Sequence, residues 1–213
     1  MNLLKQLFFY LEDVLEAYHG TKIENKKEIE TSGFAIRSKP KHIPNDLGNG
    51  IYFFLDKGDF YKPPYEMSKS FVENYKDCSH GESVIFKVTI SDNISLLDFN
   101  DEENEKKFEK FRNLNSKTIL KYYDEFVRYA KDNTGGVPGV LKRANLDGIV
   151  FELLKIKNKS KGEICDGVIK DTYTPQNKKY NKSSFHNGRE LCLYNIEKID
   201  EIKEIVEPEK GDM

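Results

Sequence analysis

Four short segments of the sequence carry side chains that could bind and transform a ligand. His19, Tyr52 and Glu190 are their most reactive members. An imidazole changes charge near neutral pH, an aromatic face attracts a flat cation, and a fixed carboxylate can stabilise positive charge as it develops. No segment is specific by itself, so their order along the chain is the informative feature. In that order they are Tyr18-His19-Gly20-Thr21, Gly48-Asn49-Gly50-Ile51-Tyr52-Phe53, Ser68-Lys69-Ser70-Phe71 and Arg189-Glu190-Leu191-Cys192-Leu193-Tyr194.

Each of these residues also has a purely structural interpretation. His19 could be a partly buried histidine at the end of a strand, with Gly20 as a turn residue. Glu190 could lie at a solvent-exposed strand edge, although an ionised carboxylate at the first position of a buried strand needs partners. A functional interpretation therefore depends on the four segments occurring together.

The four segments resemble the ADP-ribosyltransferase superfamily, specifically its diphtheria-toxin and poly(ADP-ribose) polymerase branch, whose signature is a His, a Tyr and a Glu on three separate strands. The resemblance extends from about Tyr18 to Ile199. It implies an α+β domain in which a split antiparallel β-sheet with peripheral helices holds NAD between its two halves. It also implies an enzyme that transfers ADP-ribose from NAD, its co-substrate, to a macromolecular acceptor and releases nicotinamide.

The resemblance gives each matching residue a role. His19 would hydrogen-bond a ribose of NAD, and the backbone of Gly20, followed by Thr21, would hold the nicotinamide amide, which a side chain at Gly20 would block. The ring of Tyr52 would stack on nicotinamide. Glu190 would be the catalytic carboxylate near the ribose 2′-hydroxyl, where it stabilises the positive charge of an oxocarbenium-like transition state.

The match is looser in the segment that follows Tyr52. Ser70 would help to hold the carboxamide, whereas Lys69 would either orient the catalytic carboxylate or be an ordinary surface lysine. An insertion that includes Pro63-Pro64 separates Tyr52 from the serines. The second aromatic residue of the nicotinamide sandwich is therefore either Phe71 or Tyr75.

The acceptor is expected to be a protein or a nucleic acid. Gly188 stands where arginine-modifying members of the other branch carry Glu or Gln, which argues against arginine as the acceptor. The stretch 155–182 contains eight lysines against three acidic residues, and as a basic loop before the catalytic strand it could hold a phosphate backbone. A solvated loop in a lysine-rich protein explains the same residues without a function.

Two other functions remain open at this point. The chain could be an NAD glycohydrolase that uses water as the acceptor, or a catalytically silent module that binds NAD or ADP-ribose. The joint presence of His19, Tyr52 and Glu190 favours an active enzyme, which we expect to attach a single ADP-ribose unit. The biological setting could be a toxin, antiphage defence or regulation.

Hydrophobic periodicity predicts the elements that must position these residues. Alternating apolar residues favour a strand over 83–90, and apolar stripes at helical spacing favour helices over 65–76 and 116–132. The other predicted elements are a helix over residues 1 to about 16, a strand that ends at 17–20, a short exposed helix over 22–32, a charged helix over 101–112, and strands over 51–55, 147–153 and 190–194.

Length and composition fit one soluble globular domain. The 213 residues are 38% hydrophobic and 33% charged, with a formal net charge of −2. These values exclude collagen-like and strongly disordered chains and provide no global basic field. We expect one domain over 1–213, with a core at about 15–200 and an acidic tail at 201–213, and the oligomeric state stays open.

Cysteine usage and hydropathy indicate the compartment. Cys78, Cys165 and Cys192 are far apart and odd in number, so we expect a reducing compartment and no disulfide framework. No cysteine–histidine spacing is typical of a zinc site, and we expect no metal. The apolar run 7–11 is too short to span a membrane. We therefore expect a cytoplasmic protein, or one delivered into a target cell without a recognisable signal.

Overall fold

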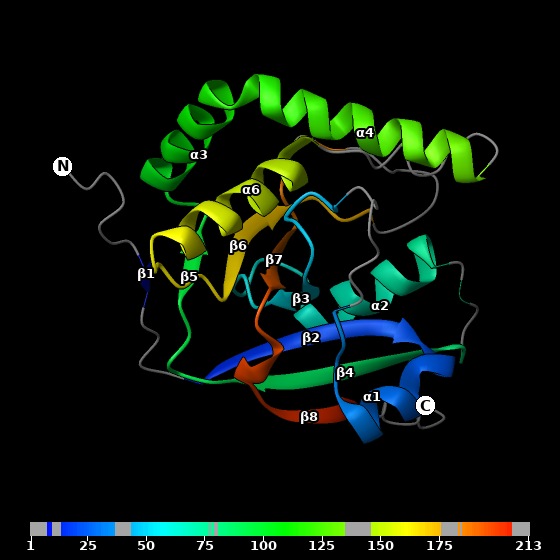
Figure 1. The fold of residues 1–213 in the computed structure, drawn as a ribbon. Coiled ribbons are helices and arrows are strands. Elements are labelled where there is room, and N and C mark those ends of the chain that lie inside the picture. The colour runs from blue at the N-terminus through cyan, green and yellow to red at the C-terminus, as the bar shows by residue number, and fades with distance from the viewer. Residues whose placement is uncertain are drawn as a thin grey trace, which may run out of the picture.

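A computed structural model of the chain describes residues 8–9, 14–36, 44–76, 78, 81–134, 146–175, 183 and 185–205. Within these residues the chain forms an α+β fold of five helices and a mixed, mostly antiparallel open sheet (Figure 1). The predicted α+β class is confirmed. None of the described helices is long and apolar enough to cross a membrane.

The sheet has the strand order β1-β5-β6-β7-β3-β2-β4-β8. The pair β5–β6 is parallel, and the other neighbouring strands are antiparallel. The strands are β1 (Phe8–Phe9), β2 (Leu15–Lys22), β3 (Ile51–Leu55), β4 (Ser83–Ile90), β5 (Leu96–Asp98), β6 (Gly167–Thr172), β7 (Gly188–Leu193) and β8 (Ile199–Ile205).

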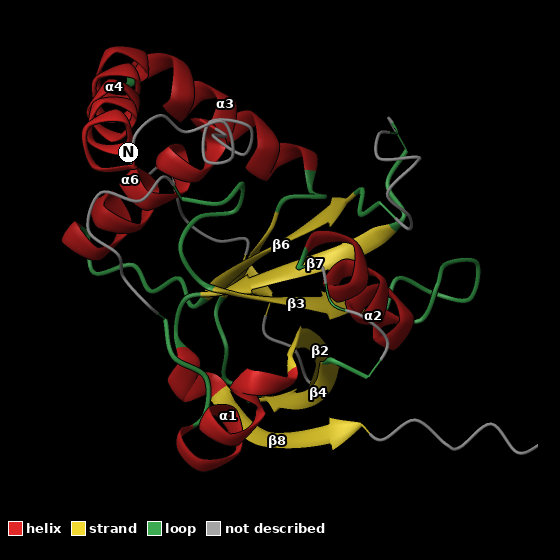
Figure 2. Cartoon of the chain, turned by 90° about the vertical axis from the view of Figure 1, so that its right-hand side faces the viewer, coloured by secondary structure: helices red, strands yellow, loops and turns green. Residues whose placement is uncertain are grey.

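The sheet consists of two well-paired groups of strands that meet at a narrow join. On one side, β2 pairs with β4 along its whole length, from Leu15 opposite Ile90 to Lys22 opposite Ser83. On the other side, β2 pairs with β3 only where Tyr18 lies opposite Phe54. Figure 2 shows β3, β6 and β7 in one group and β2, β4 and β8 in the other. Adjacent central strands therefore separate within the sheet instead of continuing their ladder.

The helices cover the two groups separately. Figure 1 shows α3, α4 and α6 together beside β5, β6 and β7, whereas α2 packs against β2, β3 and β4. The helices are α1 (Lys26–Ser32), α2 (Pro64–Tyr75), α3 (Glu102–Leu114), α4 (Ser116–Thr134) and α6 (Leu146–Ser160), and two 3-10 turns are η1 (Ile23–Asn25) and η2 (Ile196–Lys198).

Alternation along the central strands builds two hydrophobic cores, one on each face of β3 and β7. Phe53 and Leu191 belong to the first core, which also contains Phe86 of β4. Cys192 belongs to the second core, which is formed mainly by α3, α4 and α6, and Tyr52 packs against it. Burial on both faces explains why residues 51–55 form an uninterrupted apolar run.

Most predicted elements are confirmed. The strands over 51–55 and 83–90 and the helices over 65–76, 101–112 and 116–132 occur within a few residues of their predicted bounds. The predicted helix over 22–32 is η1 followed by α1, which ends at Gly33 as expected. The predicted strand over 190–194 is β7, which begins two residues earlier.

The prediction of a strand over 147–153 is wrong, because these residues lie in α6. A short buried apolar run fits a helix as well as a strand, and here the three buried residues Ile149–Phe151 face the second core from a helix. The tail expected at 201–213 is also wrong in part, since 201–205 belong to β8 and pair with β4.

The helix predicted over residues 1 to about 16 is wrong where the structure describes it. Phe8 and Phe9 form the short strand β1, and Leu15 and Glu16 begin β2. The prediction for residues 1–7 and 10–13 lies outside the described residues. β2 then continues past Gly20 to Lys22, so the strand does not end where a turn was predicted.

Candidate functional site

A cavity of about 700 Å³ lies where β2 and β3 separate, and we call it the central cavity. Its volume is within the range of small-molecule sites. Three of the residues that line it come from separate strands: His19 from β2, Tyr52 from β3 and Glu190 from β7. The complete lining is His19, Asn45, Asp46, Gly50, Ile51, Tyr52, Phe71, Tyr75, Lys76, Thr172, Tyr173, Thr174 and Glu190.

His19 bridges the gap between the separating strands. Its Nδ1 lies 2.7 Å from the carbonyl oxygen of Tyr52, and since a carbonyl only accepts, Nδ1 carries the proton and Nε2 is the acceptor. Burial, followed by the nearby charge of Lys76, lowers the pKa of His19 to about 4. The imidazole is therefore neutral at pH 7. Its ring meets the rings of Phe34 and Phe53 edge to face, at 5.1 and 5.7 Å between centroids.

His19 and the other two candidates extend from different faces of the sheet. The contacts of His19 with Phe34 and Phe53 place its ring on the side of the first core. Tyr52 and Glu190 lie on the opposite side by strand alternation. All three border the central cavity because β2 leaves β3 after a single pair.

The hydroxyl of Tyr52 is occupied by the turn that precedes its strand. It accepts a hydrogen bond from the amide of Leu47 at 2.9 Å, and it lies 3.1 Å from the carbonyl oxygen of Gly48 and 3.3 Å from Asp46 Oδ1. Burial raises the pKa of Tyr52 well above its ordinary value, so the phenol stays protonated. The ring is therefore the part of Tyr52 that a ligand can contact.

Glu190 is a buried carboxyl group and does not lie at a solvent-exposed strand edge. In β7 it pairs with Phe54 of β3 on one side and Lys170 of β6 on the other. Burial, followed by the charge of Asp46, raises its pKa to about 8, and polar contacts with Thr172 and Thr174 oppose the shift only in part. Glu190 is therefore mostly protonated at neutral pH in the free protein.

Gly20 is required by the packing of α2 on β2. A Cβ atom at Gly20 would clash with the carbonyl oxygen of Ser68 and lie 2.5 Å from Val72 Cγ2. Gly20 is not among the residues that line the central cavity, so the reason for glycine that the structure shows is packing, and the close approach of a ligand stays a prediction. The carbonyl oxygen of Gly20 accepts a hydrogen bond from Lys76 Nζ at 3.1 Å.

The helix α2 presents its aromatic residues to the central cavity, and not its serines. Phe71 and Tyr75 both line the cavity and stack on each other, with centroids 5.0 Å apart and an interplanar angle of 29°. Ser70 and Lys69 are not among the lining residues. Ser68, which is fully buried, instead donates to the carbonyl oxygen of Tyr18 at 3.1 Å.

Thr21, a further candidate of the first segment, also lies away from the cavity lining. It is buried, and its hydroxyl accepts a hydrogen bond from Asn25 Nδ2 at 3.0 Å. This contact ties the end of β2 to η1. The structure therefore brings His19, Tyr52, Glu190, Phe71 and Tyr75 together at the central cavity. Thr21, Lys69 and Ser70 are not among its lining residues.

Apart from Gly50 and Ile51 of the second segment, six lining residues were not candidates for the NAD site in the sequence analysis: Asn45, Asp46, Lys76, Thr172, Tyr173 and Thr174. Asp46 lies in a stretch whose Pro, Asn and Gly residues indicated only a loop. Lys76 follows the end of α2, and Thr172, Tyr173 and Thr174 lie at the end of β6, a strand that was not predicted. The available signal was the Asn45-Asp46 pair, which Leu47 separates from Gly48-Asn49-Gly50 and which places polar side chains close to the strand of Tyr52.

A second cavity, of about 430 Å³, adjoins the first, and we call it the side cavity. It shares Asp46, Thr172 and Tyr173 with the central cavity. The rest of its lining consists of Leu47, Phe99, Glu105, Phe108, Glu109, Asp147, Phe151, Lys170, Asp171, Ser183 and His186.

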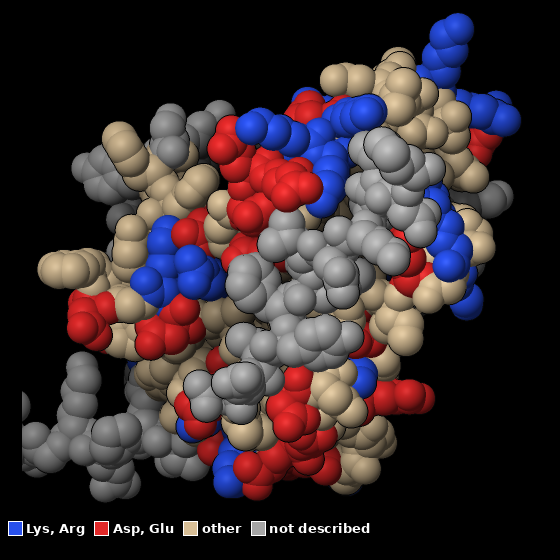
Figure 3. Space-filling view, turned by 90° about the vertical axis from the view of Figure 1, so that its left-hand side faces the viewer, with Lys and Arg blue, Asp and Glu red and all other residues tan. Residues whose placement is uncertain are grey.

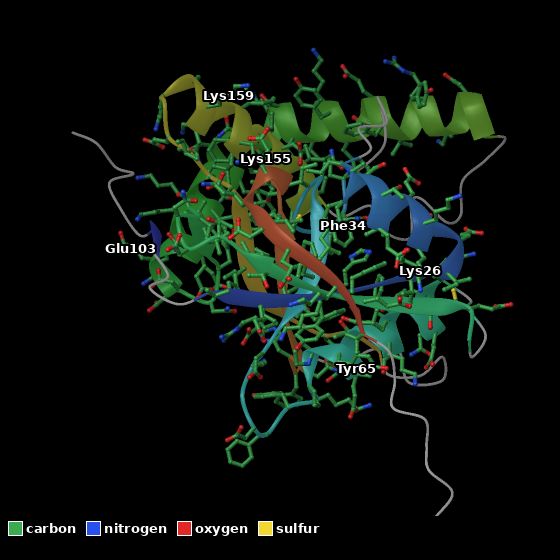
Figure 4. All side chains as sticks on the ribbon, turned by 90° about the horizontal axis from the view of Figure 1, so that it is seen from below. Lys26, Phe34, Tyr65, Glu103, Lys155 and Lys159 are labelled. Atoms are coloured by element: carbon green, nitrogen blue, oxygen red, sulfur yellow. The ribbon has the colours of Figure 1, made fainter. Side chains whose placement is uncertain are left out.

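The lysine-rich stretch 155–182 is not one loop. Its first lysines belong to α6, where Figure 4 shows Lys155 and Lys159, and β6 lies within the same stretch. Lys155 pairs with Glu152 at 2.6 Å, and Lys170, the only described lysine of the stretch that lines the side cavity, pairs with Glu105 at 3.0 Å. Described basic and acidic side chains lie beside each other over much of the face in Figure 3. The expected basic contacts at 178, 179 and 182 lie outside the described residues.

No group of His, Cys, Asp and Glu side chains among the described residues is arranged to hold a metal ion. The three cysteines are free thiols. Comparison of the chain with known protein families, with curated proteins and with solved structures finds no match.

Proposed function

We propose that this protein transfers ADP-ribose from NAD to a macromolecular acceptor and releases nicotinamide. The observation that carries the proposal is that His19, Tyr52 and Glu190, on three separate strands, line one cavity of suitable size. The three residues lie far apart in the sequence, occur in the order that the resemblance requires, and line the same cavity. The narrow join between β2 and β3 further supports a split sheet of the ADP-ribosyltransferase type.

The lining of the central cavity suits the nicotinamide end of NAD. The pyridinium ring can lie between the ring of Tyr52 and the stacked rings of Phe71 and Tyr75, where aromatic faces attract its positive charge. The carboxamide can take over the carbonyl oxygen of Gly20, which Lys76 Nζ occupies in the free protein. His19 is a neutral imidazole whose Nε2 has no hydrogen-bond partner among the described residues, so it can accept a hydrogen bond from a ribose hydroxyl.

Glu190 supports the bond cleavage in this proposal. The bond between the ribose carbon and the nicotinamide nitrogen breaks, and its electron pair leaves with nicotinamide, so positive charge develops on the ribose. The pyridinium charge of bound NAD lowers the pKa of Glu190 and favours its ionised form. A buried carboxylate close to the ribose then stabilises the developing cation, and loss of such a group costs about 10²–10³-fold in rate.

Nicotinamide release is the direct test. Purified protein is incubated with NAD labelled in the adenosine part and with a whole-cell lysate, and released nicotinamide and the fate of the label are measured. Wild type should release nicotinamide, and Glu190→Gln should slow the release by about 10²–10³-fold. Glu201→Gln, the same substitution at an exposed position of β8, is the matched control and should act as wild type.

The label distinguishes the alternatives. Label in the protein or nucleic-acid fraction identifies the class of acceptor. Free ADP-ribose formed at full rate without lysate would replace the transferase by an NAD glycohydrolase. NAD binding without any nicotinamide release would overturn the enzymatic proposal and leave a binding module.

A further inference from the structure

The two cavities are separated by a wall that contains a carboxylate. Asp46, Thr172 and Tyr173 are the residues that line both cavities. Asp46 lies on the turn before β3. Its charge raises the pKa of Glu190, which lines the central cavity, and the charge of Asp147, which lines the side cavity, raises the pKa of Asp46. A group in the side cavity and a group in the central cavity would therefore both be within reach of this side chain.

The turn that carries Asp46 is held from several directions. Gly48 pairs with Asn45 in a β-bridge, and its amide donates to the Asn45 carbonyl oxygen at 2.9 Å. Gly48 has a φ of 91°, which favours glycine. Neighbouring elements fix the rest of the turn. Tyr194, the residue after β7, donates to the carbonyl oxygen of Leu47 at 2.6 Å, and Glu152 of α6 accepts from the amide of Asn49 at 2.7 Å.

The helix α6 also presses on this turn directly. Gly148 leaves no space for a Cβ atom, because that atom would clash with the carbonyl oxygen of Asn45. The turn that carries Asp46 is thus held by Tyr194 and α6, and the carboxylate itself accepts from the hydroxyl of Tyr52 in β3 at 3.3 Å. Such preorganisation is typical of groups that act in a reaction and is more than a surface loop needs.

The surroundings of Asp46 suit a proton acceptor. Burial raises its pKa, and hydrogen bonds from Tyr52 and from the amide of Leu47 oppose the shift only in part. A carboxylate with a raised pKa is a stronger base than an exposed one while it remains ionised. The buried hydroxyl of Thr172, which lines both cavities as Asp46 does, is near Glu190 but has no partner with hydrogen-bond geometry among the described residues, so a polar group of a ligand can satisfy it.

We propose that the side cavity receives the acceptor and that Asp46 is the general base that removes its proton. This inference rests on the proposed function and adds a second catalytic residue to it. As the ribose–nicotinamide bond breaks, an acceptor O–H or N–H group enters from the side cavity, its heteroatom bonds to the ribose carbon, and its proton passes to Asp46. Asp46 then returns the proton to water.

The lining of the side cavity restricts the acceptor. It combines aromatic rings, Phe99, Phe108 and Phe151, with several carboxylates, among them Glu105 and Glu109. Lys170 also lines the cavity and pairs with Glu105 at 3.0 Å, so the carboxylates there are partly neutralised. Because Asp46 removes a proton in this proposal, the acceptor group is a donor of a proton, such as an amide, hydroxyl, amine or exocyclic base amino group, and not an ionised phosphate or carboxylate, which has no proton to give.

The test uses a nucleophile that carries no proton. NAD is supplied with lysate, with and without added sodium azide, and nicotinamide release and 1-azido-ADP-ribose are measured. Asp46→Asn keeps the size of the side chain and its ability to accept from Tyr52, and it removes both the base and the negative charge. Its release rate without azide should fall by about 10²–10⁴-fold, and azide should restore it. Asp200→Asn, at an exposed position of β8, is the matched control.

Glu190→Gln separates this proposal from the proposed function. Its defect lies in the transition state for bond cleavage, so azide should not restore its activity. If wild type releases nicotinamide and Asp46→Asn keeps the wild-type rate, or loses activity that azide does not restore, the assignment of Asp46 is wrong while the proposed function stands. If wild type releases no nicotinamide, both are wrong.

Discussion

Replacement of Glu190 by glutamine should change how the stability of the protein depends on pH. Burial and the charge of Asp46 raise the pKa of Glu190 from 4.5 to about 8, so between these values the folded protein keeps a proton that the unfolded chain has lost. The stabilisation associated with this proton is complete below pH 4.5 and is lost as the pH rises through 8.

His19 acts in the opposite direction over a lower range. Its pKa falls from 6.5 to about 4 on folding, so below pH 6.5 the unfolded chain gains a proton that the folded protein does not. Between pH 4.5 and 6.5 the two groups therefore oppose each other with similar slopes of about 1.4 kcal/mol per pH unit. Of these two groups, Glu190 alone acts from pH 6.5 to 8, and its contribution should lower the free energy of unfolding by about 2 kcal/mol there.

Urea unfolding at closely spaced pH values measures this interval. Wild type should lose about 2 kcal/mol between pH 6.5 and 8, whereas Glu190→Gln should show a flat profile there and lose stability only below pH 6.5, where His19 still acts. Glu201→Gln should keep the wild-type profile. A wild-type free energy that is constant from pH 6.5 to 8, or a glutamine variant that retains the decrease, would refute the assignment of a buried, protonated Glu190.

Three further predictions follow from contacts at the same site. The kcat/KM for nicotinamide release should rise about tenfold per pH unit below pH 8 and level off above it, because the free enzyme must ionise Glu190; a profile that is flat from pH 6 to 9 would contradict this. Gly20→Ala should lower the free energy of unfolding in urea by about 1–3 kcal/mol, since α2 must move away from β2; a change within experimental error would show that the contact is not tight. Lys76→Met should raise the pKa of His19 towards 6.5 in an NMR titration, and an unchanged pKa would exclude the charge of Lys76 as a cause.

Local patterns in the sequence were sufficient for elements whose hydrophobic period is unambiguous. The alternation over 83–90 indicates only a strand and the helical stripe over 65–76 only a helix, and β4 and α2 confirm these predictions. The run 147–153 has no such period, because buried residues on a helix inside a core look like those of a buried strand. β6 and β8 contain charged residues such as Lys170, Asp171, Glu201 and Lys203, which conceal their alternation, and ion pairs on the sheet surface explain why these residues are tolerated.

For the candidate site, too, the sequence predicted some residues and missed others. His19, Tyr52 and Glu190 lie on strands or strand ends that short motifs could locate, and their meeting required the resemblance to a known order of segments. Asp46 and Thr172 could not be found, because their importance depends on which loop touches which strand across more than a hundred residues of sequence. The roles expected of Ser70 and Lys69 placed them near the ligand, yet the rotation of α2 turns Phe71, Tyr75 and Lys76 to the cavity instead.

Because β2 and β3 form a single pair, main-chain groups in the middle of the sheet are left without a bond to the neighbouring strand. Side chains bond to three carbonyl oxygens at this join: Ser68 to that of Tyr18, Lys76 to that of Gly20 and His19 to that of Tyr52. An interior strand thus keeps the recognition properties of an edge strand, while α2 shields it from pairing with another chain. In the proposed function, the carboxamide of nicotinamide would replace the amine of Lys76 at the carbonyl of Gly20, and no strand–strand hydrogen bond would have to break.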